Sequence, residues 1–150
     1  YRKGIDLIIE LAKLCPDYNF TLLGVKDELN HLQLTKNIKL LPPVPHAELV
    51  NYYSQYEFYL QLSVAEGFPN ALCEAMLCGC IPIGSDVFGI TDIIGDTGFI
   101  LKKKDVALLK GLIDEAVKSD KITLTKKARQ RIIDNFPEEK REQKLLSVIS

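Results

Sequence analysis

The stretch SVAEGFPNALCEAMLCGCIPIGSD, residues 63–86, decides the fold. Pro69 suits the first turn of a helix, because the amide that proline lacks would have no partner there. Gly79 suits the end of that helix. The short apolar run IPIGS comes next and is typical of a buried strand. The stretch therefore predicts a helix over 69–79 that leads directly into a strand over 81–85.

Helices and strands alternate on both sides of this unit. The apolar pattern predicts strands over 19–24, 37–42, 58–62, 81–85 and 98–101. It predicts helices over 4–14, 26–34, 46–55, 69–79, 105–118, 122–135 and 137–149. Because connections are short and hairpin signals are absent, this order predicts a doubly wound, Rossmann-like α/β domain. Its mostly parallel sheet would carry helices on both faces.

In such domains, ligands bind where the strands end and the helices begin. The segments to search are therefore 24–27, 42–46, 63–70 and 85–92.

The composition fits one ordinary domain over residues 1–150. Apolar residues make up 47% of the chain and charged residues 26%, which is a globular balance. A formal net charge of −1 creates no overall field that would attract nucleic acid. No apolar run approaches the roughly 18 residues of a transmembrane helix. These numbers favour a protein without nucleic acid as a partner.

The cysteines predict neither a disulfide framework nor a zinc site. They are Cys15, Cys73, Cys78 and Cys80. The last three are spaced unlike zinc ligands, and His31 and His46 lie elsewhere in the sequence. Buried, reduced thiols of a cytoplasmic protein are the expected state. The chain also lacks an Asp-x-Asp motif, since Asp86, Asp92 and Asp96 are spread over a loop. We therefore expect no metal site and no cofactor.

The start of the helix over 69–79 predicts an anion site. If the helix begins near Pro69, the amides of Asn70, Ala71 and Leu72 point out of its N-terminus. Such an end carries partial positive charge and directional donors, which suit a diphosphate. Gly67 lets the backbone approach a ligand closely.

Two glutamates flank this helix start. Glu74 falls about one turn into the helix, where its carboxylate could accept hydrogen bonds from the hydroxyls of a ribose. Glu66 lies in the loop before the helix and could face the reacting part of a ligand. A glutamate in a first turn also complements the helix dipole by about 0.3–1 kcal/mol without any ligand. For each glutamate taken alone, both interpretations stay open.

The pattern S-x-x-E-G-F-P-N-A-L-C-E-A-M resembles the E-x7-E signature of retaining GT-B glycosyltransferases, the glycosyltransferase group 1, family 4 type. Other pieces resemble the same family in the same order. They are RKGIDLIIELAKL (2–14), FTLLG (20–24), LLPPVPHAELVNYY (40–53), GDTGFIL (95–101) and IIDNFPEEKREQKLLSVI (132–149). By this resemblance the chain is the C-terminal half of a GT-B enzyme, the half that binds a nucleotide-sugar.

The resemblance assigns a role to each residue of the site. Glu74 would hold the ribose hydroxyls, and Glu66 would contact the donor sugar near its anomeric centre. Lys3 would neutralise the leaving diphosphate, and Val44 would lie beside the nucleobase. The diphosphate and sugar would meet the backbone of Gly67, Phe68, Pro69, Asn70 and Ala71. Glu66 and Lys3 are thus the expected catalytic residues.

The resemblance also implies the reaction. A hexose would pass from a nucleoside-diphosphate sugar to a glycan or lipid-linked acceptor, with retention of configuration, no metal and no covalent enzyme intermediate. The acceptor domain and a middle strand of the sheet would precede Tyr1, so the isolated chain is expected to be inactive and to expose two strand edges.

Three alternatives stay open. They are a GT-B-fold epimerase or phosphorylase, a non-catalytic nucleotide-sugar-binding module and, with least support, a receiver-like module. The cluster Lys126, Lys127, Arg129 and Arg131 is expected to be a solvated face. Peripheral contact with the inner face of the cytoplasmic membrane is its alternative.

Overall fold

The structure is a computed structural model that describes residues 3–140, apart from the side chain of Lys26. Its helices are α1 (Ile5–Leu14), α2 (Lys26–Leu29), α3 (Leu49–Tyr53), α4 (Asn70–Leu77), α5 (Ile90–Ile94), α6 (Val106–Lys118) and α7 (Lys121–Asn135), with the 3-10 turn η1 (His46–Glu48). Its strands are β1 (Phe20–Leu23), β2 (Ile38–Leu41), β3 (Phe58–Gln61), β4 (Ile81–Ser85) and β5 (Phe99–Leu101). Most of the helix expected over 137–149 lies outside the described residues.

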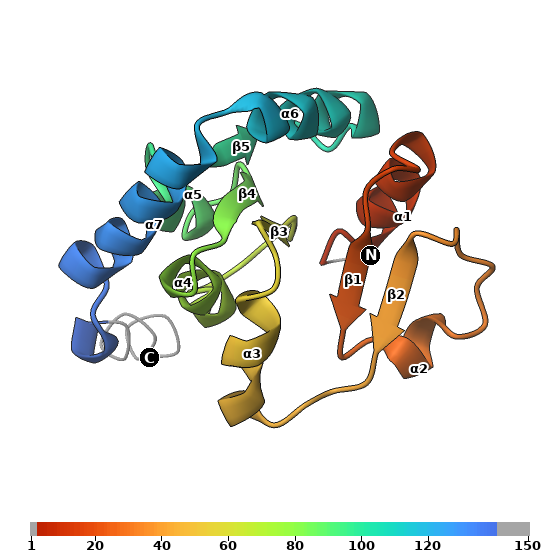
Figure 1. Cartoon of the computed structure of the whole chain (residues 1–150), viewed down its shortest axis with the longest axis horizontal. Helices are drawn as coiled ribbons and strands as arrows, with labels where there is room; N and C mark the ends of the chain where they lie inside the picture. The colour runs from red at the N-terminus through yellow and green to blue at the C-terminus, as the bar shows by residue number, and fades with distance from the viewer. Residues whose placement is uncertain (1–2, 141–150) are drawn as a thin grey trace.

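The strands form two parallel sheets, where the sequence predicts one. β1 pairs with β2, and β4 pairs with β3 on one side and β5 on the other. Figure 1 shows β1 and β2 beside α1, with α4 to α7 gathered around the second sheet. β1 and β3 each pair on one side within the described chain, and residues of both line a cavity of about 1020 Å³.

The core has two clusters, and the first of them joins the two sheets. The apolar side of α1 and that of α6 pack together with residues of β1, β4 and β5. A second cluster joins α4, α5 and α7, where Leu72, Ile94 and Ile132 are almost fully buried. Burial of this kind stabilises by about 1.5–3 kcal/mol for each large apolar side chain. The second cluster fixes α4, and with it the segment that the sequence marks as the site.

Several boundaries differ from those that the sequence predicts. The helix expected over 26–34 is only the four-residue α2, and the one expected over 46–55 is divided into η1 and α3. The segment 85–92, expected as a loop, contains the start of α5. The two long helices begin within one residue of the predicted starts, and Asp105 and Asp120 cap them by accepting hydrogen bonds from the amides of Leu108 and Thr123.

Gly4, at the start of α1, packs directly against the residue that follows β3. Its φ is 74°, a left-handed conformation that favours glycine. A Cβ atom at this position would clash with the carbonyl oxygen and the side chain of Leu62. Two backbones are therefore in direct contact here, and this contact places Lys3 above the end of β3.

The basic cluster on α7 is not one uniform solvated face. Lys126, Lys127 and Arg129 are exposed, as the sequence predicts. Arg131 is half-buried, and its guanidinium donates to the carbonyls of Ile93 and Asp92 at 2.7 Å. Arg131 therefore satisfies the end of α5, a structural role that the sequence does not reveal. Within residues 3–140, no helix combines the length and the apolar character needed to cross a bilayer.

All four cysteines are free thiols. The burial of one of them, Cys80, leads us to expect that the protein loses stability at alkaline pH. Its side chain is 1% exposed, and burial raises its pKa from the ordinary 9.0 to about 12. Above pH 9 the unfolded chain releases this proton, whereas the folded chain keeps it until about pH 12. The contribution to stability is therefore complete below pH 9 and is lost as the pH rises toward 12.

Urea unfolding on both sides of pH 9 measures this effect. The free energy of unfolding should fall more steeply above pH 9 in the unmodified protein than in the variant Cys80→Ala, which cannot titrate there. Equal slopes in the two proteins would contradict the prediction.

Candidate active site

The site begins with an ion pair between residues far apart in the sequence. Lys3, just ahead of α1, donates from Nζ to Oε2 of Glu66 at 3.0 Å. The Lys3 side chain is 60% exposed, whereas that of Glu66 is 16% exposed. The fold thus brings together the two residues that the sequence marks as catalytic, and it leaves the cation in solvent.

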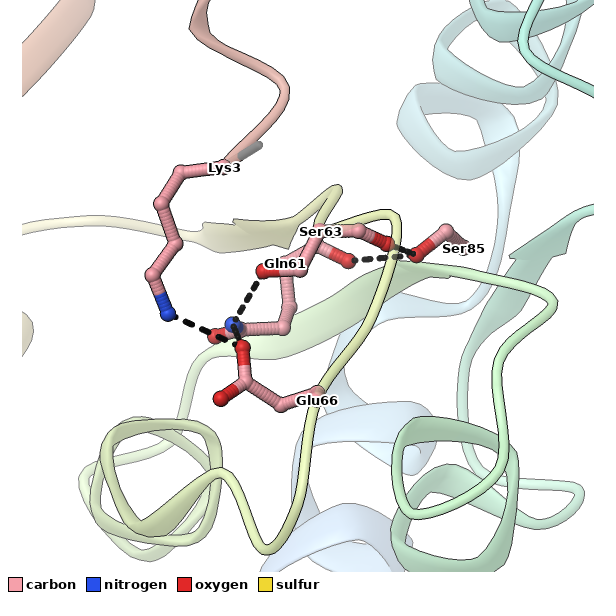
Figure 2. A network of polar contacts seen from close by, with 5 residues as sticks. All are labelled: Lys3, Gln61, Ser63, Glu66 and Ser85. Atoms are coloured by element: carbon pink, nitrogen blue, oxygen red, sulfur yellow. Dashed lines mark hydrogen bonds and ion pairs between the residues drawn. The ribbon is translucent and has the colours of Figure 1, made fainter. Parts of the chain in front are cut away.

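Glu66 has a second, buried partner. Nε2 of Gln61, at the end of β3, donates to the same Oε2 atom at 3.2 Å and to Oγ of Ser63 at 3.2 Å. Ser85, at the end of β4, donates to the carbonyl of Ser63 at 2.5 Å. Figure 2 shows the resulting network, which links the ends of two strands to the Lys3–Glu66 pair.

The expected helix start lies directly after this loop. α4 begins at Asn70, and Pro69 is its N-cap residue. The amide of Leu72 donates to the carbonyl of Pro69 at 3.1 Å, so the prediction that it points outward is wrong. The first turn of α4 is therefore closed by its own backbone at Leu72. A ligand at this end would meet the first two residues, Asn70 and Ala71.

Glu74 is the fifth residue of α4, about one turn into the helix, as the sequence predicts. Its side chain is 21% exposed, and Oε1 lies 2.8 Å from Nε2 of His46 in η1. The contact ties the connection after β2 to α4. Within residues 3–140 the hydrogen bond of Glu74 uses one carboxylate oxygen, and Oε2 is left for a ligand.

The surroundings of Glu74 are partly apolar. Burial, followed by the nearby Glu74 carboxylate, raises the pKa of the Tyr53 phenol from 10.0 to about 12. Burial and then the same carboxylate also raise the pKa of the Cys78 thiol. Both groups stay neutral near pH 7, so the charge of Glu74 has no charged neighbour in either of them.

The loop between Glu66 and α4 packs against the segment that follows β4. Gly89 has a φ of 94°, and a Cβ atom there would clash with the carbonyl oxygen of Gly67. Gly67 is exposed. The close approach of the two backbones supports the loop from the side opposite to solvent.

The predicted residues do not all face one hollow. Those that line the cavity of about 1020 Å³ are Lys3, Glu66, Phe68, Pro69, Asn70 and Ala71. Gly67, Glu74 and Val44 are not part of this lining. Val44 is half-buried in the connection between β2 and η1, two residues before His46. Glu74 and Val44 thus lie outside the lining of the cavity that Lys3 and Glu66 share.

The acidic residues considered for a metal do not gather. Asp86 lies 3.9 Å from Lys102, and the backbone carbonyl of Asp92 binds Arg131. Across the part of the chain that the structure describes, no group of three or more His, Cys, Asp or Glu side chains is arranged to hold a metal ion.

Two residues of the site are not identified from the sequence. Gln61 lies in a segment that reads only as an apolar strand, and its signal is a single polar residue at the end of that strand. His46 reads as the first residue of a helix. Its signal is its place in the segment 42–46, one of those expected to meet a ligand.

Comparison with known proteins adds sequence relatives. Residues 1–139 match the family described as glycosyl transferases group 1. The chain is 30% identical over 128 residues to a subunit of human phosphatidylinositol N-acetylglucosaminyltransferase, covering 78% of this chain and 26% of that protein. It is 30% identical over 149 residues to N-acetyl-alpha-D-glucosaminyl L-malate synthase of Bacillus anthracis, covering 90% of this chain and 38% of that protein. The chain thus spans well under half the length of these relatives.

Solved structures share the fold. The Anabaena protein HepE in complex with UDP-glucose superposes with a TM-score of 0.80 at 18% identity, covering 99% of this chain and 45% of HepE. At this identity the likeness concerns the fold alone. It confirms the predicted α/β fold of the GT-B type.

Proposed function

Because the family match covers almost the whole chain, the chain belongs to the glycosyl transferases group 1 family, and we propose that it is the donor-binding domain of a retaining glycosyltransferase. The donor would be a nucleoside-diphosphate hexose, and the acceptor a glycan or a lipid-linked sugar. The observation that carries the proposal is the meeting of Lys3 and Glu66 at 3.0 Å, beside the start of α4.

Each part of the site fits one part of such a donor. Oε2 of Glu74, the oxygen that does not contact His46, would accept hydrogen bonds from the ribose hydroxyls, and Val44 would lie beside the base. The backbone from Gly67 to Ala71 would receive the diphosphate and the sugar. Glu66 would bind the sugar near its anomeric carbon.

The reaction requires stabilisation of charge on a leaving group. As the glycosidic bond breaks, the nucleoside diphosphate gains negative charge, and the ammonium of Lys3 together with the start of α4 would stabilise it. The acceptor hydroxyl would attack from the face that the diphosphate leaves, which retains the anomeric configuration. In this proposal the compensating charge comes from the protein and no metal takes part.

The location that we propose is the cytoplasm, because four free thiols suit a reducing compartment. The exposed Lys126, Lys127 and Arg129 would allow contact with an anionic membrane surface, where a lipid-linked acceptor lies.

Calorimetric titration of the full-length protein tests the proposal. UDP-glucose, UDP-N-acetylglucosamine and GDP-mannose are titrated with and without EDTA. We expect one of them to bind, with the same affinity in EDTA, and we expect NMR of the product to show the anomeric configuration of the donor. Failure of a folded protein to bind any nucleotide-sugar of a wider set would overturn the proposal, and an inverted product would overturn retention.

A further inference from the structure

Gln61 is unusual because it is a polar side chain buried at the end of a strand. It is 8% exposed and lies opposite Gly84 in the parallel register of β3 and β4. Burying an amide is unfavourable unless its hydrogen bonds are made. The place of Gln61 in the sheet therefore needs an explanation beyond packing.

Its hydrogen bonds converge on the candidate active site. Nε2 of Gln61 donates both of its hydrogens, one toward Glu66 and one toward Ser63, each at 3.2 Å. Ser85 donates to the carbonyl of Ser63 and, at 3.5 Å, to that of Gln61. The main chain at the end of β3 is thus tied to the end of β4, and the side-chain amide of Gln61 reaches from there to Glu66 (Figure 2).

Gln61 and Lys3 both donate to the same oxygen of Glu66, but their side chains differ in freedom to move. Lys3 is 60% exposed and its long side chain can turn toward an arriving anion, whereas Gln61 is fixed inside the sheet. If Lys3 turned toward a diphosphate, Gln61 would remain as the donor that keeps Oε2 of Glu66 in place. Oε1 of Glu66 is then available to a sugar hydroxyl.

We propose that Gln61 is a positioning residue that orients Glu66 and thereby sets how strongly the site prefers a nucleotide-sugar over the bare nucleoside diphosphate. The inference rests on the proposed function, because it assigns Glu66 to the sugar. It also gives the buried network of Ser85, Ser63 and Gln61 a specific role, since this network transmits the rigidity of the sheet to one carboxylate.

The test compares two affinities in each variant of the full-length protein. The affinity for UDP-glucose and that for UDP-N-acetylglucosamine are each compared with the affinity for UDP, and the affinity for GDP-mannose is compared with that for GDP. In Gln61→Leu we expect the nucleotide-sugar to bind about three- to tenfold more weakly, which is the net contribution of an ordinary hydrogen bond, because Gln61 acts on the sugar only through the orientation of Glu66. Binding of UDP or GDP should not change. A loss of fold would instead weaken both ligands.

Two further variants separate a positioning role from a structural one. Gln130→Leu removes an exposed amide of α7 and should leave both affinities unchanged. Gln61→Glu places a second carboxylate against Glu66, so the sugar preference should be lost at neutral pH and recovered at lower pH, where the two carboxylates share a proton. Lys3 and Tyr59 also face Glu66 and are the same in every variant.

The outcomes distinguish a failure of the proposed donor-binding function from a failure of the positioning role of Gln61. If the unmodified protein bound no nucleotide-sugar, the proposed function would fail and the inference with it. If it bound one, and both Gln61→Leu and Gln61→Glu kept the unmodified ratio of affinities at every pH, the role of Gln61 alone would be wrong.

Discussion

Replacing Lys3 with alanine is expected to lower kcat for glycosyl transfer by about 100- to 1,000-fold, the usual cost of removing a group that stabilises charge in a transition state. The charge in question develops on the leaving diphosphate, so the loss should appear mainly in kcat and much less in KM. Initial rates at several donor concentrations, measured with the full-length protein, separate the two constants.

The position of Lys3 makes this variant easy to interpret. Its side chain is largely exposed, and an exposed ion pair contributes only about 0–1 kcal/mol to stability, so Lys3→Ala should keep its melting temperature. Lys13→Ala is the matched control, because Lys13 is an exposed lysine of α1 that pairs with Glu10 at 3.0 Å. A kcat in Lys3→Ala equal to that of Lys13→Ala would remove Lys3 from the catalytic residues.

Replacing Glu74 with alanine is expected to weaken the binding of the nucleoside diphosphate by about 10- to 150-fold, which corresponds to roughly 1.5–3 kcal/mol for hydrogen bonds to a charged group. The ribose belongs to both UDP and UDP-sugars, so both should lose affinity by the same factor. This distinguishes Glu74 from Gln61, whose loss should affect the sugar alone. Calorimetric titration of the two ligands measures the factor directly.

Two control variants accompany Glu74→Ala, one at the same position in α4 and one at an exposed glutamate of α6. Glu74→Gln keeps one acceptor oxygen and should lose less affinity than Glu74→Ala. Glu115→Ala removes an exposed carboxylate of α6 and should bind as the unmodified protein does. If Glu74→Ala bound UDP with unchanged affinity while remaining folded, the carboxylate would serve only the helix dipole and His46.

The local parts of this fold could be predicted from the sequence. The helix of the opening stretch, the five strands and the capped starts of α6 and α7 depend on periodicity, proline, glycine and capping residues, which act within a few positions. The ends of α2 and α3 could not be predicted, because short helices depend on tertiary packing rather than on propensity. The same reason applies to α5.

The contacts that complete the site join residues far apart along the chain. Lys3 and Glu66 are 63 positions apart, and His46 and Glu74 are 28 positions apart. Family resemblance suggests that Lys3, Glu66 and Glu74 belong to one site, but it does not show that Lys3 touches Glu66. Gln61 carries no signal beyond its polarity, because its importance arises from the pairing of β3 with β4.

The contact of Gly4 with Leu62 has a consequence for divergence. Since the main chain of Gly4 touches Leu62 at this point, the spacing between the start of α1 and the end of β3 does not depend on the outward side chains of α1. Relatives can therefore exchange the outward residues of α1 to suit new surroundings without disturbing that spacing.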